Sequence, residues 1–189
     1  MLVCFDKTIK LRLKISTSRT IWITGLSGSG KSTLAAKVVN FLKNKGLPVI
    51  HLDGDKLREV FGSSKDLKKN HSRKSRIFLA MQYSLLCQLI SNQGVIVVCS
   101  TISMFKEVHE WNRANLSNYI EVFLKVPLEE LKRRDPKKIY QRYDIGKLKN
   151  VAGLDLLVDE PKKPDWLFDF NSDKKYTVEF MANEIVKNL

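Results

Sequence analysis

The sequence lacks the marks of a membrane-spanning protein and of a disulfide-stabilised secreted protein. No apolar run among its 189 residues approaches the roughly 18 residues needed to cross a bilayer. The first residues, Met1 to Asp6, are too few and too soon charged for a signal peptide. The three cysteines, Cys4, Cys87 and Cys99, are far apart, odd in number and without metal-ligand spacing. We therefore expect a cytoplasmic protein with free thiols.

Internal repeats, low-complexity linkers and aromatic-interleaved RNA-binding motifs are also absent. The length suits one domain with a full hydrophobic core. Lys and Arg number 33 against 20 Asp and Glu, a net charge of +13. Because these charges are spread over the whole chain, they favour small polyanionic substrates over nucleic acid. We expect a small nucleotide as partner and no membrane, and we leave a homodimer open.

One motif dominates what is present, a G-x-x-x-x-G-K-[ST] sequence at residues 25–32. A β-rich apolar run precedes it and apolar residues at helical spacing follow, the setting in which this motif binds phosphate. Glycines let backbone N–H groups approach the phosphates, and the helix N-terminus adds partial positive charge. Lys31 would reach the β- and γ-phosphates of ATP, and the Ser32 hydroxyl would bind Mg²⁺. The ATP-binding residues predicted in this loop are Gly25, Ser27, Gly28, Ser29, Gly30, Lys31, Ser32 and Thr33.

Strand-like and helix-like segments alternate along the chain. The expected strands are residues 20–24, 48–52, 95–99, 120–124 and 166–170. The expected helices are residues 31–45, 72–92, 104–116, 127–134 and 176–188. This order predicts an α/β fold of the P-loop NTPase type, a three-layer sandwich with a parallel five-stranded sheet and helices on both faces.

Two segments stand outside this alternation. Residues 8–16 alternate between apolar and basic, which predicts a strand with one wet face, so residues 1–18 are interpreted as an N-terminal extension with an edge strand. Residues 19–189 form the predicted kinase domain. Within it, the polar stretch of about 135–164 is too long for a simple connection and is expected to be a lid.

Two carboxylates, Asp53 and Asp55, follow the second expected strand. Ligands of open parallel sheets lie beyond the carboxyl ends of strands, so both acids should face the phosphate site. The third expected strand ends in Cys99–Thr101 without an acid, which favours Asp53 and Asp55 as the source of the carboxylate near Mg²⁺. One would accept a proton from an attacking hydroxyl and the other would hold Mg²⁺. The alternative is an Asp-Gly turn with a helix N-cap at Asp55.

Basic residues gather where the lid should begin, at residues 133–138. Cations such as Arg134 would close over the triphosphate and stabilise charge on the transferred group. The same run is also typical of a solvated helix end, and both interpretations stay open. Structural roles are expected for the histidines, which share no spacing: His51, His71 and His109.

Taken together, residues of about 19–165 resemble the adenylylsulfate kinase family. The resemblance is carried by Gly25–Thr33, Leu52–Asp55 with Arg58, Ile102-Ser103, Glu121–Leu124 before Pro127-Leu128, and a lid signature of Arg134–Lys137, Tyr140, Gly146, Lys149-Asn150, Gly153 and Asp155. That family uses Mg-ATP to phosphorylate the 3′-hydroxyl of adenylyl sulfate. The resemblance implies that Asp55 is the catalytic base beside Lys31, with Ser32 and Asp53 at Mg²⁺. The acceptor-binding residues that it implies are Asp53, Arg58, Arg76, Ile102, Ser103 and Lys149.

The sequence departs from the family in the acceptor half of the site. The family has Asp-Arg and then Glu-Asn-x-Arg-Arg at the start of the long helix. Counting back from Gly94 without gaps aligns that first Arg with Arg76 and puts residues 78–82 in place of the polar cluster. A longer-helix register would instead use Asn70 and Arg73. In the lid, Val151–Gly153 replaces Phe-Thr-Gly, so the aromatic face that stacks on adenine is lost.

These departures favour a specialised kinase with an intact ATP half. One relative of the family acts on cytidine diphosphoramidate in capsule biosynthesis, and Ser100–Phe105 with Asn112-Arg113 resembles such divergent members. Adenylyl sulfate remains the nominal acceptor and cytidine diphosphoramidate the alternative. A nucleotide- or RNA-binding module without catalysis, and another small-molecule P-loop kinase, are the remaining hypotheses.

Overall fold

The structure is a computed structural model that describes residues 18–61, 72–171 and 175–189. The strand predicted over residues 8–16 lies outside these residues, so the N-terminal extension stays a prediction. In chain order the elements are β1 (Arg19–Thr24), α1 (Lys31–Asn44), β2 (Val49–Asp53), α2 (Gly54–Phe61), α4 (Arg73–Ser91), β3 (Ile96–Ser100), α5 (Lys106–Asn115), β4 (Tyr119–Lys125), α6 (Leu128–Arg134), α7 (Ile139–Asp144), β5 (Trp166–Asp169) and α8 (Val178–Lys187).

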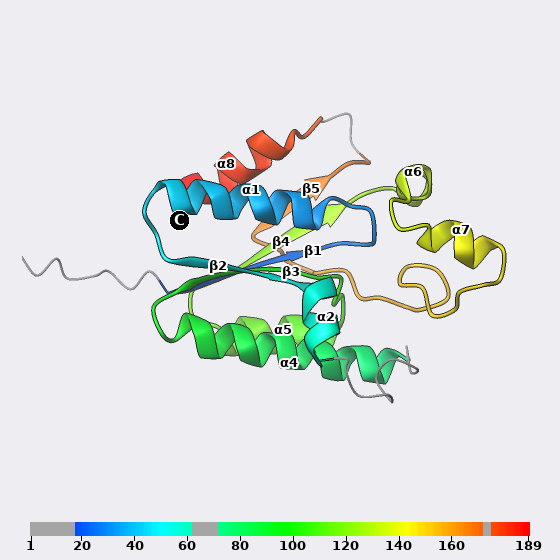
Figure 1. Cartoon of the computed structure of the whole chain (residues 1–189), viewed down its shortest axis with the longest axis horizontal. Helices are drawn as coiled ribbons and strands as arrows, with labels where there is room; N and C mark the ends of the chain where they lie inside the picture. The colour runs from blue at the N-terminus through cyan, green and yellow to red at the C-terminus, as the bar shows by residue number, and fades with distance from the viewer. Residues whose placement is uncertain (1–17, 62–71, 172–174) are drawn as a thin grey trace, which may run out of the picture.

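The five strands form one parallel sheet in the order β2-β3-β1-β4-β5. Helices α1 and α8 cover one face, and α4 and α5 cover the other (Figure 1). The predicted α/β fold with a parallel five-stranded sheet is therefore confirmed. Since all strands run the same way, their carboxyl ends meet at one edge, where α2, α6 and α7 also lie (Figure 1).

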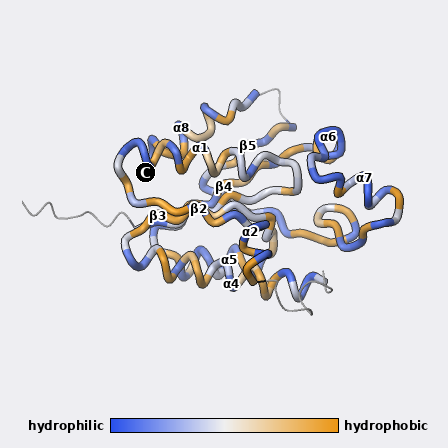
Figure 2. Tube along the Cα trace, in the orientation of Figure 1, coloured by the Kyte–Doolittle hydropathy of each residue, from blue (hydrophilic) through white to orange (hydrophobic). Residues whose placement is uncertain are grey.

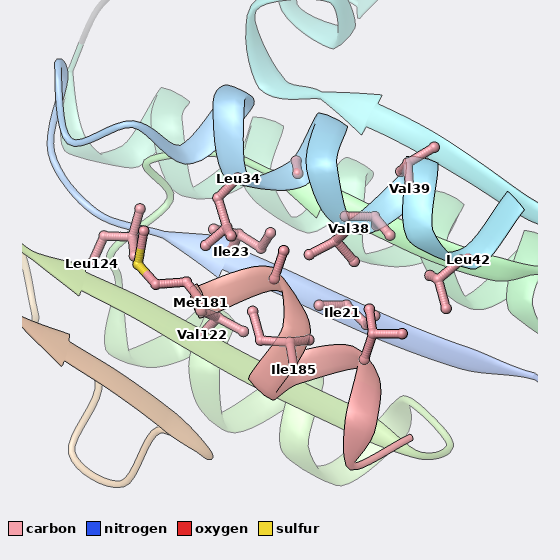
Figure 3. Packing of buried hydrophobic residues seen from close by; sticks show 14 of the residues in the cluster. Ile21, Ile23, Leu34, Val38, Val39, Leu42, Val122, Leu124, Met181 and Ile185 are labelled. Atoms are coloured by element: carbon pink, nitrogen blue, oxygen red, sulfur yellow. The ribbon is translucent and has the colours of Figure 1, made fainter. Parts of the chain in front are cut away.

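Helix α1 is fixed to the sheet by an apolar stripe that its sequence dictates. Leu34, Val38 and Leu42 recur every four residues and are fully buried, as expected for the inner face of an amphipathic helix. They pack against the sheet face that α8 also covers, beside Met181 and Ile185 of that helix (Figure 3). Burying each such side chain stabilises the fold by about 1.5–3 kcal/mol. The phosphate loop therefore leads into a firmly anchored helix.

A small separate cluster holds the segment that includes α6 and α7. Its buried members are Val126, Leu131, Tyr140 and Val151, and Leu26 of the phosphate loop packs against them. Helix α6 itself is mostly hydrophilic (Figure 2). The segment is thus tied to the phosphate loop by a few apolar contacts rather than by the main core.

Two short helices appear that the main sequence prediction did not include, although a helix N-cap at Asp55 was its alternative. Helix α7 has six residues, too few to show a periodic pattern, and lies within the stretch predicted to be irregular. Helix α2 begins at Gly54, directly after β2. In the part of the chain that the structure describes, no helix is both long and apolar enough to cross a bilayer.

Candidate active site

The phosphate loop joins β1 to α1 through glycines in conformations that other residues rarely adopt. Gly28 and Gly30 have φ angles of 80° and 93°. Because Gly30 is the N-cap of α1, no side chain covers the free amides at the helix N-terminus. A Cβ on Gly25 would lie 2.6 Å from the Leu124 carbonyl oxygen, so that glycine permits the loop to approach β4 closely.

Lys31 points back into this loop. Its Nζ donates to the Leu26 carbonyl oxygen at 2.7 Å and contacts Ser29 Oγ at 3.4 Å. Burial of the ammonium, with help from the nearby Lys137 cation, lowers the pKa of Lys31 to about 8. A bound polyphosphate would relieve both effects by placing negative charge beside the ammonium.

Asp53, the last residue of β2, is held by three hydrogen bonds. Ser32 Oγ donates to Asp53 Oδ2 at 2.6 Å, and Ser100 Oγ donates to the same oxygen at 3.0 Å. The amide of Asp55 donates to Oδ1 at 3.0 Å. Partial burial opposes ionisation of Asp53, but these hydrogen bonds outweigh it and hold its pKa below the usual value. The carboxylate is therefore ionised and fixed beside the Ser32 hydroxyl.

Asp55 lies in the first turn of α2, and its carboxylate forms an ion pair with Lys137. Two cavities meet at this pair, because both residues line each of them. The first cavity, of about 420 Å³, is lined by phosphate-loop residues together with Asp53 and Arg134. The second, of about 210 Å³, is lined in part by α7 and by residues 148–152. The carboxylate thus stands at the passage between a phosphate site and a second small-molecule site.

The second cavity is strongly cationic. Five basic side chains line it: Arg58, Arg76, Lys137, Arg142 and Lys149. Arg76 donates to the Asn150 carbonyl oxygen at 2.8 Å. Burial and the neighbouring Arg58 guanidinium lower the pKa of Arg76 to about 10. Because these like charges line one small cavity, they favour an anionic ligand there.

The remaining wall of the second cavity is aliphatic. It consists chiefly of Ile102, Ile139, Leu148, Val151 and Ala152, and no aromatic side chain is among the described residues that line it. A nucleotide base in this cavity would be held by aliphatic and charged groups rather than by ring stacking.

The structure brings together most, but not all, of the residues predicted from the sequence. Gly25, Ser29 and Ser103 line neither cavity among the described contacts. Ser103 is buried, with a φ of 25°, and its hydroxyl bonds Thr101 Oγ1 at 2.8 Å. Gly25 and Ser29 instead support the loop itself.

The two registers for the long helix place different arginines at the site. Arg76, from the ungapped register, lines the second cavity. Arg73 lies elsewhere, with bonds of 3.0 Å to Glu107 Oε1 and 2.6 Å to Asp159 Oδ2. Asn70, its partner in the alternative register, lies outside the described residues.

Sequence reasoning named Lys137 only within the basic run and the lid signature and did not name Arg142, yet both line the second cavity. Lys137 belongs to the lid signature, so its presence there was a usable signal. Arg142 belongs to no motif, and it reaches the cavity only because helix α7 directs it there.

This arrangement of loop, cavities and carboxylate defines a class of enzyme. A parallel sheet whose phosphate loop opens into one cavity, with a carboxylate at the passage to a second, is the architecture of a P-loop kinase.

The comparisons narrow this class to one family. The family model for adenylylsulphate kinase matches residues 17–169, so the chain belongs to the adenylylsulphate kinase family. It is an ATP-dependent phosphotransferase with a hydroxyl acceptor, which sets aside the non-catalytic nucleotide- or RNA-binding module.

Several relatives are similar over most of their length. A cytidine diphosphoramidate kinase of Campylobacter jejuni is 37% identical over 142 residues, 75% of this chain and 81% of that protein. An adenylyl-sulfate kinase of Pseudomonas entomophila is 38% identical over 152 residues, 79% of this chain and 71% of that protein. The solved Mycobacterium tuberculosis APS kinase CysC in complex with AMPPNP and APS superposes with a TM-score of 0.80 at 31% identity, covering 90% of this chain and 96% of that one.

Proposed function

We propose that this chain transfers the γ-phosphate of ATP to the 3′-hydroxyl of a small nucleotide bound in the second cavity. The observation that carries the proposal is the position of Asp55 at the passage between the two cavities. ATP would occupy the first cavity, with its phosphates over the loop and Arg134 at the lid side. Homodimer assembly and the movement of residues 135–164 as a lid stay predictions.

Mg²⁺ fits the donors present beside the loop. Ser32 and Asp53 offer oxygen ligands, the kind that Mg²⁺ prefers. Within the described residues no cluster of three or more His, Cys, Asp or Glu forms a metal site alone. This agrees with an ion that keeps waters and takes substrate phosphates as ligands. When bound, Mg²⁺ would neutralise charge on the β- and γ-phosphates.

The reaction would be an in-line displacement. The acceptor oxygen forms a bond to the γ-phosphorus as the bond to the β,γ-bridging oxygen breaks, and the acceptor proton passes to Asp55. For this step Lys137 must leave Asp55, and the γ-phosphate offers it a stronger anionic partner. Lys31 and Lys137 would then both face the transferred group.

Adenylyl sulfate is the nominal acceptor because it is the substrate of the family. The aliphatic wall at Val151 and Ala152 favours a second candidate, cytidine diphosphoramidate, since an adenine would find no aromatic face there. The similarity to the Campylobacter jejuni enzyme supports the same candidate. Both acceptors carry the anionic groups that the five cations of the cavity would bind.

The test compares the two acceptors directly. Purified protein with Mg-ATP is incubated with adenylyl sulfate or cytidine diphosphoramidate, and 3′-phosphorylated product is measured. Asp55→Asn should lose about 10²–10⁴-fold in turnover while it still binds ATP. Asp144→Asn, an exposed lid-segment aspartate that pairs with Lys132, is the matched control and should keep its turnover. ATP binding without transfer to any nucleotide would overturn the proposal.

A further inference from the structure

A chain of hydrogen bonds runs from the proposed metal ligand Ser32 back into the sheet. Ser32 Oγ and Ser100 Oγ both donate to Asp53 Oδ2, at 2.6 and 3.0 Å. His51 Nε2 lies 3.0 Å from Ser100 Oγ. In the β2–β3 register Asp53 is paired with Ser100, and His51 lies two residues earlier on the same strand face. The histidine that the sequence assigned a structural role thus ends this chain.

The proton count fixes the direction of every bond. A hydroxyl has one proton, and that of Ser100 is used on Asp53. The ionised carboxylate can only accept. His51 must therefore donate its Nε2 proton to Ser100 Oγ, so one donor at Nε2 sets the rotation of the Ser100 hydroxyl.

The same assignment of protons leaves Ser32 Oγ able to bind a cation. Because Ser32 donates its proton to Asp53, its lone pairs are directed away from the carboxylate and into the first cavity, which Ser32 lines. Asp53 Oδ1 also accepts from the Asp55 amide, so the chain fixes the start of α2 as well. Without the His51 donor, the buried Ser100 hydroxyl can rotate and release one of the bonds that orient Asp53.

We propose that His51 is a positioning residue for the Mg²⁺ that accompanies the nucleotide, acting through Ser100 and Asp53 on Ser32. This proposal rests on the proposed function, because it assumes that Mg-nucleotide binds over the phosphate loop. It adds a residue of β2 that touches neither nucleotide nor acceptor. Outer hydrogen-bond partners of metal ligands tune metal affinity in this way.

The experiment measures how strongly Mg²⁺ and nucleotide bind together. The ADP dissociation constant is determined by calorimetry in EDTA and in excess Mg²⁺, and the ratio of the two values gives the Mg²⁺ enhancement. His51→Leu should lower this enhancement about fivefold and leave ADP binding in EDTA unchanged. His51→Gln should restore it, since the glutamine amide can donate from a similar position. Ile50→Ala, an exposed neighbour on β2, is the matched control.

A double-mutant cycle separates positioning from general packing. Ser100→Ala should lower the Mg²⁺ enhancement by itself, and His51→Leu should have no further effect in that background. An unchanged enhancement in His51→Leu, an equal loss in EDTA, or an additive loss in the double variant would overturn the inference. If His51→Leu does not fold, a folded His51→Gln protein whose Mg²⁺ enhancement falls below that of the parent overturns the inference in its place. Absence of any Mg²⁺ enhancement in the parent protein would instead contradict the proposed function.

Discussion

Replacing Lys31 with methionine should stabilise the nucleotide-free protein while it removes nucleotide binding. The pKa of Lys31 falls from its ordinary value of 10.5 to about 8, chiefly because the ammonium is buried. Each pKa unit is worth about 1.36 kcal/mol, so holding Lys31 charged costs up to about 3 kcal/mol at pH 7. The side chain keeps some solvent contact, and methionine leaves the Leu26 carbonyl oxygen without its donor, a loss of about 1 kcal/mol. We expect a net gain of about 1–2 kcal/mol in the free energy of unfolding.

The gain should depend on pH with a definite sign. Below pH 8 the folded protein carries a charged Lys31 and the full cost is present. Between about pH 8 and 10.5 the folded state releases this proton while the unfolded state keeps it, so the cost disappears as pH rises. The advantage of Lys31→Met should therefore shrink by about 2 kcal/mol between pH 7 and 9.5.

Urea unfolding followed by tryptophan fluorescence measures both effects. Lys43→Met, an exposed lysine in the last turn of α1, is the control and should change stability by no more than about 0.5 kcal/mol. The reasoning would be refuted if the Lys31→Met protein were less stable than the parent protein at pH 7. It would also be refuted if the stability advantage of the variant were the same at pH 7 and at pH 9.5. Saturating Mg-ATP should reverse the order of stability, because only the parent protein binds it tightly.

Two further changes probe the passage between the cavities. Gly54→Ala should destabilise the protein by about 1–3 kcal/mol in thermal unfolding, because its Cβ would lie 2.9 Å from Thr101 Oγ1 and 3.1 Å from the Ser100 carbonyl oxygen. Adding Thr101→Ala should recover part of this loss, and no recovery would contradict the clash. Lys137→Met should lower kcat at least about tenfold, since a cation near the transferred phosphate is lost, and a rise in kcat would mean that Lys137 only blocks Asp55.

The fold was predictable because its signals are local. Strands such as residues 95–99 are continuous apolar runs, and α1 follows a phosphate motif with apolar residues at helical spacing. Their bounds agree with β3 (Ile96–Ser100) and α1 (Lys31–Asn44) within about two residues. The same local logic fails for α7, which is too short to show a period and is held by tertiary contacts such as the 2.9 Å bond from Tyr140 to the Ser27 carbonyl oxygen.

Contacts across long sequence separations were not predictable. The ion pair between Asp55 and Lys137 joins residues 82 positions apart, and the bond from Ser100 to Asp53 spans 47. Neither leaves a periodic or spacing pattern in the chain. The partner of His51 was not predictable for the same reason, since His51 meets Ser100 only when β2 pairs with β3.

The basic run at residues 133–138 shows why composition alone could not choose between a solvated helix end and a phosphate clamp. Arg133 is exposed and pairs with Glu130 on the helix surface, as a solvated helix end would. Arg134 lines the first cavity, and Lys137 lines both. The two interpretations therefore overlap, because Arg134 also pairs with Glu130 at 2.7 Å, and Lys137 reaches the site from beyond the end of α6. The positive charge of this run is thus divided between solvent and the two cavities.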